Sequence, residues 1–317
     1  MSKELILEFP DNDLVSLLYG EYNDHLSYLE KKLEVNISDR GNVLRISGEK
    51  KKTAKNILNA LYQKLEDGDL KNITHADIDT EIRFSENGGQ SKNNNTPPKN
   101  SVIKTKNKMI SARSPNQVKY LELLKTNDVV FGLGPAGTGK TYLSVAAGID
   151  MYLQGKVEKL VFSRPAIEAG ESLGFLPGDM KDKIDPYLRP IYDALQDMLP
   201  HDFLMKKMEV GEIEIAPLAF MRGRTLAHSY VILDEAQNTT CSQMKMFLTR
   251  MGEASHMVIT GDASQTDLPS HIKSGLHEAV EILEGVDGIG MITFDAEDVI
   301  RNPMVRKIIQ AYDKHKR

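Results

Sequence analysis

The stretch GPAGTGKT, residues 134–141, has the residue types and the spacing of a phosphate-binding loop. It fits G-x-x-x-x-G-K-[ST] at every fixed position, follows a strand-like apolar run and precedes a helix-like one. In such a loop the backbone N–H groups and the helix N-terminus attract phosphate oxygens. Lys140 is expected to reach the β- and γ-phosphates of ATP, and the Thr141 hydroxyl to bind Mg²⁺. The predicted loop residues are Gly134, Pro135, Ala136, Gly137, Thr138, Gly139, Lys140 and Thr141.

Two adjacent acids end a second apolar run, YVILDEA at 230–236. Asp234 is expected to hold Mg²⁺ directly or through water, and Glu235 to orient or deprotonate the attacking water. Kinases of small molecules usually lack the second acid at this place. The pair therefore favours hydrolysis of the nucleotide over transfer of a phosphoryl group to an acceptor.

Polar residues also follow a third apolar run, HMVITGD at 256–262. The GDxxQ spacing that follows is close to the γ-phosphate sensor of superfamily-one helicases. Asp262 and Gln265 are the candidate sensors, with Thr260 as a lesser candidate.

Residues 113–317 alternate strand-like with helix-like runs and show no internal repeat. Most of the strand candidates are continuous apolar runs, which are typical of strands buried on both faces of a parallel sheet. The predicted class is therefore α/β, with a mostly parallel sheet. The candidates are 128–133, 159–164, 212–217, 230–235, 256–261 and 289–294.

Residues 1–70 predict a small α+β domain in the order strand, helix, helix, strand, strand, helix. This is the order of a KH domain, and GEYN at 20–23 lies where such a domain carries its GXXG backbone clamp for RNA. Asn23 stands in place of the second glycine. The alternative is a module of the same class that contacts proteins.

Residues 71–112 are predicted to be a polar, flexible linker to the larger domain at 113–317, because SENGGQSKNNNTPPKNS has few apolar residues. No acid occurs from Gly88 to Arg113. The segment is either a solvated tether or an electrostatic handle for RNA phosphates.

Composition narrows the class of protein further. The 317 residues are 40% hydrophobic and 27% charged, and no apolar run approaches the roughly 20 residues of a membrane span. A single cysteine, Cys241, excludes an internal disulfide, and a cytoplasmic protein without membrane contact is expected. The net charge of −5 excludes a chain that is cationic overall, so any RNA would bind through local patches.

Six long stretches resemble the PhoH-like family, in its bacterial long form, over essentially the whole chain. The resemblance implies a RecA-like P-loop ATPase domain related to the superfamily-one helicase core, acting on RNA. It also implies a link to rRNA or ribosome precursors, with ribosome-maturation proteins as partners. One departure is Arg301-Asn302-Pro303, where the family commonly has Arg-His-Pro. The stretches are 131–143, 164–179, 217–226, 231–252, 259–269 and 298–312.

Three further residues have predicted roles that depend on this kinship. Gln117 lies where related ATPases read the adenine edge, although it could be a solvated helix residue. Transfer of the γ-phosphate is helped by an arginine that contacts it, and a RecA-like domain without a second lobe would take this arginine from a neighbouring subunit. This suggests that the chains form a ring, for example a hexamer. Arg164 and Arg301 are the candidates, unless they pair with carboxylates such as Glu168 or Glu171.

The sequence as a whole predicts a Mg²⁺-dependent ATPase coupled to RNA. Three alternatives stay open: an RNA-stimulated nucleotide switch without unwinding, a small-molecule kinase, and a scaffold stabilised by its nucleotide. The loop at 164–179 would either grip RNA or serve as a packed connection.

Overall fold

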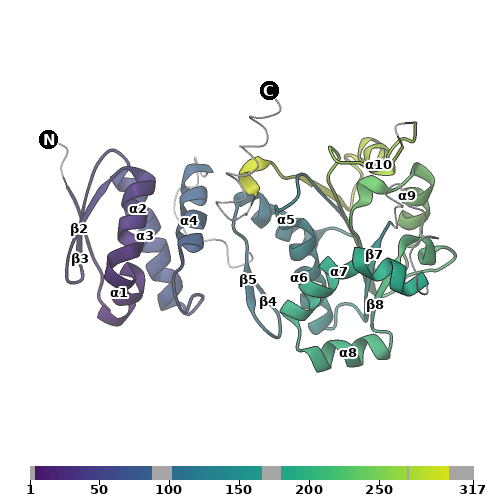
Figure 1. Cartoon of the computed structure of the whole chain (residues 1–317), viewed down its shortest axis with the longest axis horizontal. Helices are drawn as coiled ribbons and strands as arrows, with labels where there is room; N and C mark the ends of the chain where they lie inside the picture. Colours follow the sequence, from purple (N-terminus) through teal and green to yellow (C-terminus); the bar gives the residue numbers. More distant parts are fainter. Residues whose placement is uncertain (1–3, 88–101, 166–179, 270, 300–317) are drawn as a thin grey trace. The chain divides into compact units, whose positions relative to one another are not determined.

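The structure is a computed structural model that describes residues 4–87, 102–165, 180–269 and 271–299. The chain divides into two compact units (Figure 1). The first comprises residues 1–99 with 112–115, and the second comprises 100–111 with 116–317. No helix among the described residues is long and apolar enough to cross a membrane.

The first unit confirms the predicted order of strand, helix, helix, strand, strand, helix. Its strands form an antiparallel sheet in the order β1-β3-β2. Apolar residues at helical spacing, such as Leu26, Leu29 and Leu33, are buried in one core against this sheet. The elements are β1 (Leu5–Glu8), α1 (Asn12–Tyr19), η1 (Glu21–Asn23), α2 (Asp24–Leu33), β2 (Asn36–Arg40), β3 (Val43–Ser47), α3 (Lys51–Glu66) and α4 (His75–Asn87).

The GEYN turn between α1 and α2 adopts the left-handed backbone conformation at two consecutive residues without glycine. Tyr22 has φ of 54° and Asn23 has φ of 60°. Asparagine tolerates this conformation better than most residues, which explains how Asn23 can replace the expected glycine. The Asn23 amide also donates a hydrogen bond to Asp39 Oδ1 at 3.0 Å, which ties the turn to β2.

The predicted flexible linker at 71–112 is wrong in two places. Helix α4 belongs to the first unit, because Ile73, Ile78 and Ile82 are buried in its core. Further on, β4 (Val102–Lys104) and β5 (Met109–Ser111) form an antiparallel hairpin in the second unit. The second unit therefore begins before the predicted boundary at 113.

The hairpin is attached to the C-terminal end of α7 (Met180–Met198). Lys108 Nζ pairs with Asp197 Oδ2 at 2.5 Å, and the Asn107 N–H donates to the Met198 carbonyl at 3.1 Å. Lys106 Nζ lies 3.6 Å from the centre of the Phe203 ring. These two lysines of the predicted basic tether are therefore engaged within the second unit.

The second unit is built on a six-stranded sheet in the order β11-β6-β10-β9-β7-β8, and every neighbouring pair is parallel. All six predicted strands and the α/β class are confirmed. The strands are β6 (Val129–Leu133), β7 (Lys159–Arg164), β8 (Ile213–Pro217), β9 (Ser229–Leu233), β10 (His256–Gly261) and β11 (Ile289–Thr293).

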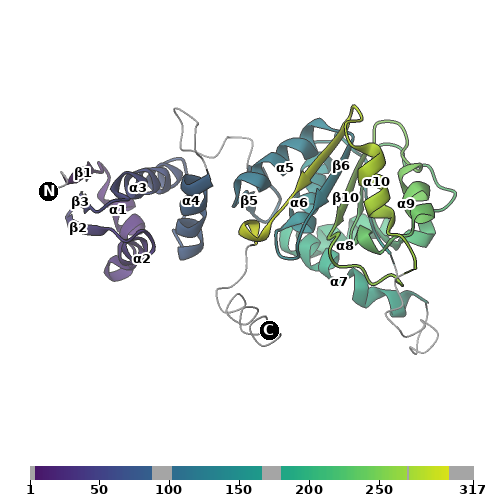
Figure 2. The same cartoon turned by 90° about the horizontal axis from the view of Figure 1, so that it is seen from above.

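Helices cover both faces of this sheet, which is why its strands read as continuous apolar runs. In Figure 2, α5 and α6 lie on one side of β6 and β10, and α9 and α10 lie on the other. Because β6, β10 and β9 are neighbours, the segments that follow them meet at one edge. The helices are α5 (Pro115–Thr126), α6 (Lys140–Leu153), α8 (His201–Glu209), α9 (Cys241–Leu248) and α10 (Gly275–Leu283).

Candidate functional site

The phosphate-binding loop connects β6 to α6 through a backbone that requires glycine at two tight points. Gly134 has φ of 132°, and a Cβ there would lie 2.4 Å from the Phe294 carbonyl oxygen. Gly139, with φ of 83°, is the residue before α6. Other residues are strained in this conformation, so the glycines shape the loop that leads into the helix N-terminus.

Lys140 is held over this loop by the loop's own carbonyl groups. Its Nζ donates to Gly134 O at 2.6 Å and to Pro135 O at 2.9 Å, and the residue is buried. Burial lowers the pKa of Lys140, while nearby Asp262 and Asp234 act in the opposite direction. The ammonium group thus lies where phosphate oxygens could replace the carbonyl oxygens as its partners.

Asp234 follows β9 and joins two hydroxyl groups from neighbouring elements. Its Oδ1 accepts from Thr141 Oγ1 at 2.7 Å and from Thr260 Oγ1 at 2.6 Å. A hydroxyl and a carboxylate are the oxygen ligands that Mg²⁺ takes when phosphates and waters complete its shell. Thr141 and Asp234 therefore fit the predicted ion. Among the described residues no group of three His, Cys, Asp or Glu side chains could hold a metal.

Thr260 on β10 is fully buried, and its hydroxyl donates to the Asp234 carboxylate. Thr260→Val keeps the shape of the side chain but removes this donor. Residues that orient a metal ligand typically contribute 10- to 100-fold to metal affinity, so we expect the Mg²⁺ concentration for half-maximal ATP turnover to rise about 10-fold. The exposed Thr293→Val, on β11, is the matched control. An unchanged Mg²⁺ dependence in Thr260→Val would contradict the role.

Glu235 lies just beyond Asp234, in a left-handed conformation with φ of 53°. Its two carboxylate oxygens have different partners: Oε1 is 3.3 Å from Arg164 Nη2, and Oε2 accepts from Gln237 Nε2. The side chain is still 38% exposed. Such a carboxylate, fixed in orientation but open to solvent, suits a base that takes a proton from water.

Gln237 also connects Glu235 to the segment after β10. Its Oε1 accepts from the Asp262 N–H at 3.1 Å, while its Nε2 donates to Glu235. Asp262 Oδ1 accepts from both the N–H and the hydroxyl of Ser264, and within the described residues its buried Oδ2 has no partner. Because an ionised carboxylate only accepts, Asp262 suits ordering this loop and not the predicted direct contact with phosphate.

Known proteins of one family resemble this chain over most of its length. The sequence model of the family "PhoH-like protein" matches residues 109–313. The PhoH-like protein of Bacillus subtilis is 48% identical over 310 residues, which cover 97% of this chain and 96% of that protein. The chain belongs to the PhoH-like family. The PhoH-like protein of Synechocystis is 40% identical over 311 residues, which cover 97% of this chain and 94% of that protein.

Two further comparisons cover less of the chain. Protein PhoH of Escherichia coli is 42% identical over 205 residues, which is 64% of this chain and 58% of that protein. The solved Pif1 helicase of Candida albicans is 14% identical with a TM-score of 0.35, over 62% of this chain and 42% of that one. The family model begins at residue 109, so residues 1–99 of the first unit precede the region that it matches.

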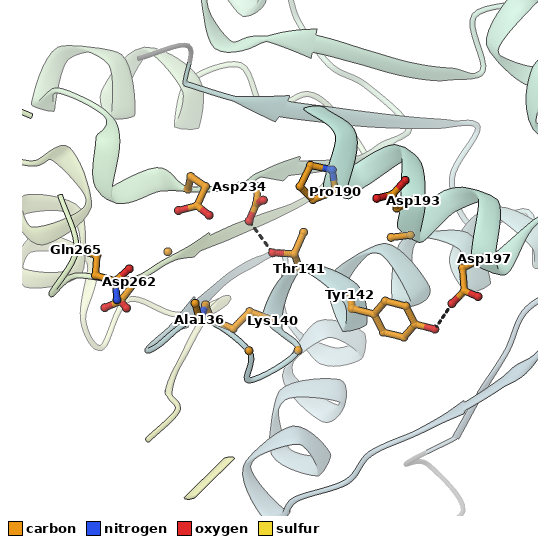
Figure 3. A pocket seen from close by; sticks show the side chains of 15 residues that line it. Ala136, Lys140, Thr141, Tyr142, Pro190, Asp193, Asp197, Asp234, Asp262 and Gln265 are labelled. Atoms are coloured by element: carbon orange, nitrogen blue, oxygen red, sulfur yellow. Dashed lines mark hydrogen bonds between the residues drawn. The ribbon is translucent and has the colours of Figure 1, made fainter. Parts of the chain in front are cut away.

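The loop, Asp234 and Glu235 of this PhoH-like chain border one cavity of about 700 Å³. Figure 3 shows Asp262 and Gln265 at one end, Lys140 and Thr141 in the middle, and Tyr142 with Asp197 at the other. Most of the residues that the sequence predicted to contact phosphate therefore line this one cavity. The residues of the phosphate-binding end are Ala136, Gly137, Gly139, Lys140, Thr141, Asp234, Glu235, Gly261, Asp262 and Gln265.

Gln117 is the predicted adenine contact. It is 2% exposed, and its Nε2 donates to the Thr138 carbonyl at 2.8 Å. A Cβ on Gly139 would lie 3.0 Å from the same nitrogen. The amide group therefore contacts the phosphate-binding loop itself, and a role in reading adenine stays a prediction.

Arg164, the first of the two candidate arginines, contacts Glu235 of its own chain. Arg301 lies outside the described residues, as do Glu168, Glu171 and most of the loop at 164–179.

The sequence reasoning missed Gln237 and the wall that α7 adds to the cavity. Asp193 and Asp197 line the cavity beside Tyr142, whose hydroxyl donates to Asp197 Oδ2 at 2.7 Å. The two acids are four residues apart, a spacing that places them on one helix face. That spacing could have signalled a shared environment, although not the cavity that they face.

Proposed function

We propose that this chain is a Mg²⁺-dependent ATPase that couples hydrolysis to the binding or remodelling of RNA. One observation carries the proposal: the adjacent acids have separate partners beside the phosphate-binding loop. The Asp234 carboxylate accepts a hydrogen bond from the Thr141 hydroxyl. Glu235 instead is oriented by Arg164 and Gln237 and faces the cavity. A metal ligand and a base side by side are what hydrolysis of a nucleoside triphosphate needs.

Each side chain would act at a stated atom. The loop N–H groups and Lys140 would hold the phosphate oxygens, and Thr141 with Asp234 would hold Mg²⁺, which supplies positive charge against the phosphates. Glu235 would accept the proton of the attacking water as the water oxygen bonds to the γ-phosphorus and ADP leaves. Arg164, beside Glu235, would stabilise negative charge on the transferred group.

RNA is the proposed partner because of the family resemblance and the order of elements in the first unit. That order is KH-like, and the GEYN turn lies between α1 and α2, where a KH domain carries its clamp, with Asn23 in place of a glycine. The proposed setting is rRNA or ribosome maturation in the cytoplasm, together with maturation proteins. The described residues form one parallel-sheet domain, so the proposed assembly is a homo-oligomeric ring, for example a hexamer, with Arg301 as the candidate for the neighbouring site.

The test is ATP turnover by the full chain with and without single-stranded and structured RNA. We expect RNA to raise kcat in the wild type, and Lys140→Ala to lose turnover because it removes the cation that the loop holds. A rate of ATP turnover that does not change when RNA is added would overturn the coupling to RNA but not the ATPase activity. Displacement of a strand from a tailed duplex would separate remodelling from a switch that only binds and releases.

A further inference from the structure

The stretch PLAFMRGRTL, residues 217–226, forms a rigid turn after the edge strand β8 and has had no role so far. In this turn, η4 (Leu218–Met221) exposes the ring of Phe220 to 57%. Leu218 and Met221 on either side are 2% and 0% exposed and belong to the core shared with α9 and α10. Their burial holds the turn in place, so Phe220 is presented to solvent by a fixed backbone.

The stretch carries two arginines, Arg222 and Arg224, and no acid. Arg224 makes a two-point contact with Glu214, at 2.6 and 2.7 Å, and Arg250 donates to the Arg224 carbonyl at 3.0 Å. These contacts neutralise Glu214 and fix the far end of the turn. Arg222 is exposed, and within the described residues its guanidinium has no hydrogen bond or ion pair. One exposed aromatic ring and one exposed guanidinium thus lie two residues apart in the same turn.

We propose that Phe220 and Arg222 bind single-stranded nucleic acid, with a base stacked on the ring and a phosphate held by the guanidinium. Stacking on exposed aromatic rings beside positive charge is how proteins hold single strands without reading their sequence. The exposed apolar surface here is one ring and not a groove, which suits a base better than an apolar protein segment. In the first unit, by contrast, acidic residues outnumber basic ones over 4–87.

The turn is also close to the catalytic groups. Its first residue, Pro217, is the register partner of Arg164 on β7, and Arg164 contacts Glu235. The turn that carries Phe220 therefore starts at the residue paired with the arginine that contacts the proposed base. This inference rests on the proposed function and names the place where that function meets its nucleic acid.

The experiment measures the Kd of the full chain for fluorescein-labelled oligouridylate and oligodeoxyuridylate by anisotropy. We expect Phe220→Ala to weaken binding about 10-fold, Phe220→Tyr to bind like the wild type, and ATP turnover without nucleic acid to stay unchanged. Arg222→Ala should lower the slope of log Kd against log salt by about one phosphate contact. Ile282→Ala, at an apolar residue on α10 that is 66% exposed, is the matched control and should change nothing.

The outcomes separate the site from the proposed function. Wild-type Kd values in both Phe220→Ala and Arg222→Ala, with RNA still bound and still stimulating turnover, would overturn the site alone. A chain that binds oligodeoxyuridylate but not oligouridylate, and loses this binding in Phe220→Ala, would support the stacking surface. The same result would overturn the coupling to RNA. A full chain that binds neither strand would overturn both.

Discussion

Glu235→Gln is expected to lower the kcat of ATP hydrolysis by roughly 10²- to 10⁴-fold, because a positioned base contributes about that much. Glutamine keeps the size of the side chain but cannot accept the proton of the attacking water. It also loses the charge that faces Arg164 at 3.3 Å. Nucleotide affinity should change little, since Lys140, Thr141 and Asp234 are untouched.

The measurement is single-turnover hydrolysis beside equilibrium binding of a fluorescent ATP analogue. Gln237→Leu is the comparison, because it keeps Glu235 but removes its amide donor, together with the acceptor of the Asp262 N–H. It should cost about 10-fold, as expected for one hydrogen bond to a charged group. Lost binding in Glu235→Gln would point to a structural role for the acid. A turnover rate like that of the wild type would remove Glu235 from the chemistry.

Most of the ATPase fold was predictable because its strands are easy to recognise in the sequence. A strand buried on both faces has few polar positions, so runs such as VVFGL and SYVIL stand out from their surroundings. The functional residues follow these runs directly, and the ends of parallel strands gather at one edge of a sheet. The loop, Asp234 and the segment after β10 were therefore placed correctly from spacing alone.

What could not be predicted depends on which strands are neighbours and on short elements. Thr260 contacts Asp234 only because β10 lies beside β9, an order that the chain sequence does not state. Gln117 looked exposed because its burial depends on the loop that folds over it. The hairpin strands have three residues each, too few to show a pattern.

Helix α4 was missed for a related reason, and its one buried acid leads to a second large effect. THADIDTEIRFSEN reads as polar, yet Ile78 and Ile82 lie one turn apart and pack inward. Between them, Glu81 is 3% exposed and contacts Lys64 Nζ of α3 at 2.5 Å. A helix that buries an acid needs a cation in contact with that acid. For Glu81 the cation is Lys64, which lies 17 residues earlier in the chain.

Lys64→Met is expected to lower the unfolding free energy of the first unit by about 3–5 kcal/mol, because it leaves Glu81 buried without a cation. Burial raises the pKa of Glu81, and Lys64 opposes that rise. Without Lys64 the folded-state pKa rises further, so the carboxyl becomes protonated at a higher pH in the folded state. The stability that this protonation gives is present below the unfolded pKa and is lost as pH rises through the folded pKa. The deficit should therefore be largest near neutral pH and shrink under acid.

Hydrogen exchange of α3 and α4 peptides in the full chain measures the effect without depending on the second unit. Lys71→Met, at an exposed lysine of the same unit, controls for loss of a positive charge. The double variant Lys64→Met with Glu81→Met should recover most of the protection, since replacing both members of a buried pair by apolar residues is often near neutral. If Lys64→Met exchanged like Lys71→Met, the pair would be a surface contact in solution, and α4 would be held by its isoleucines alone.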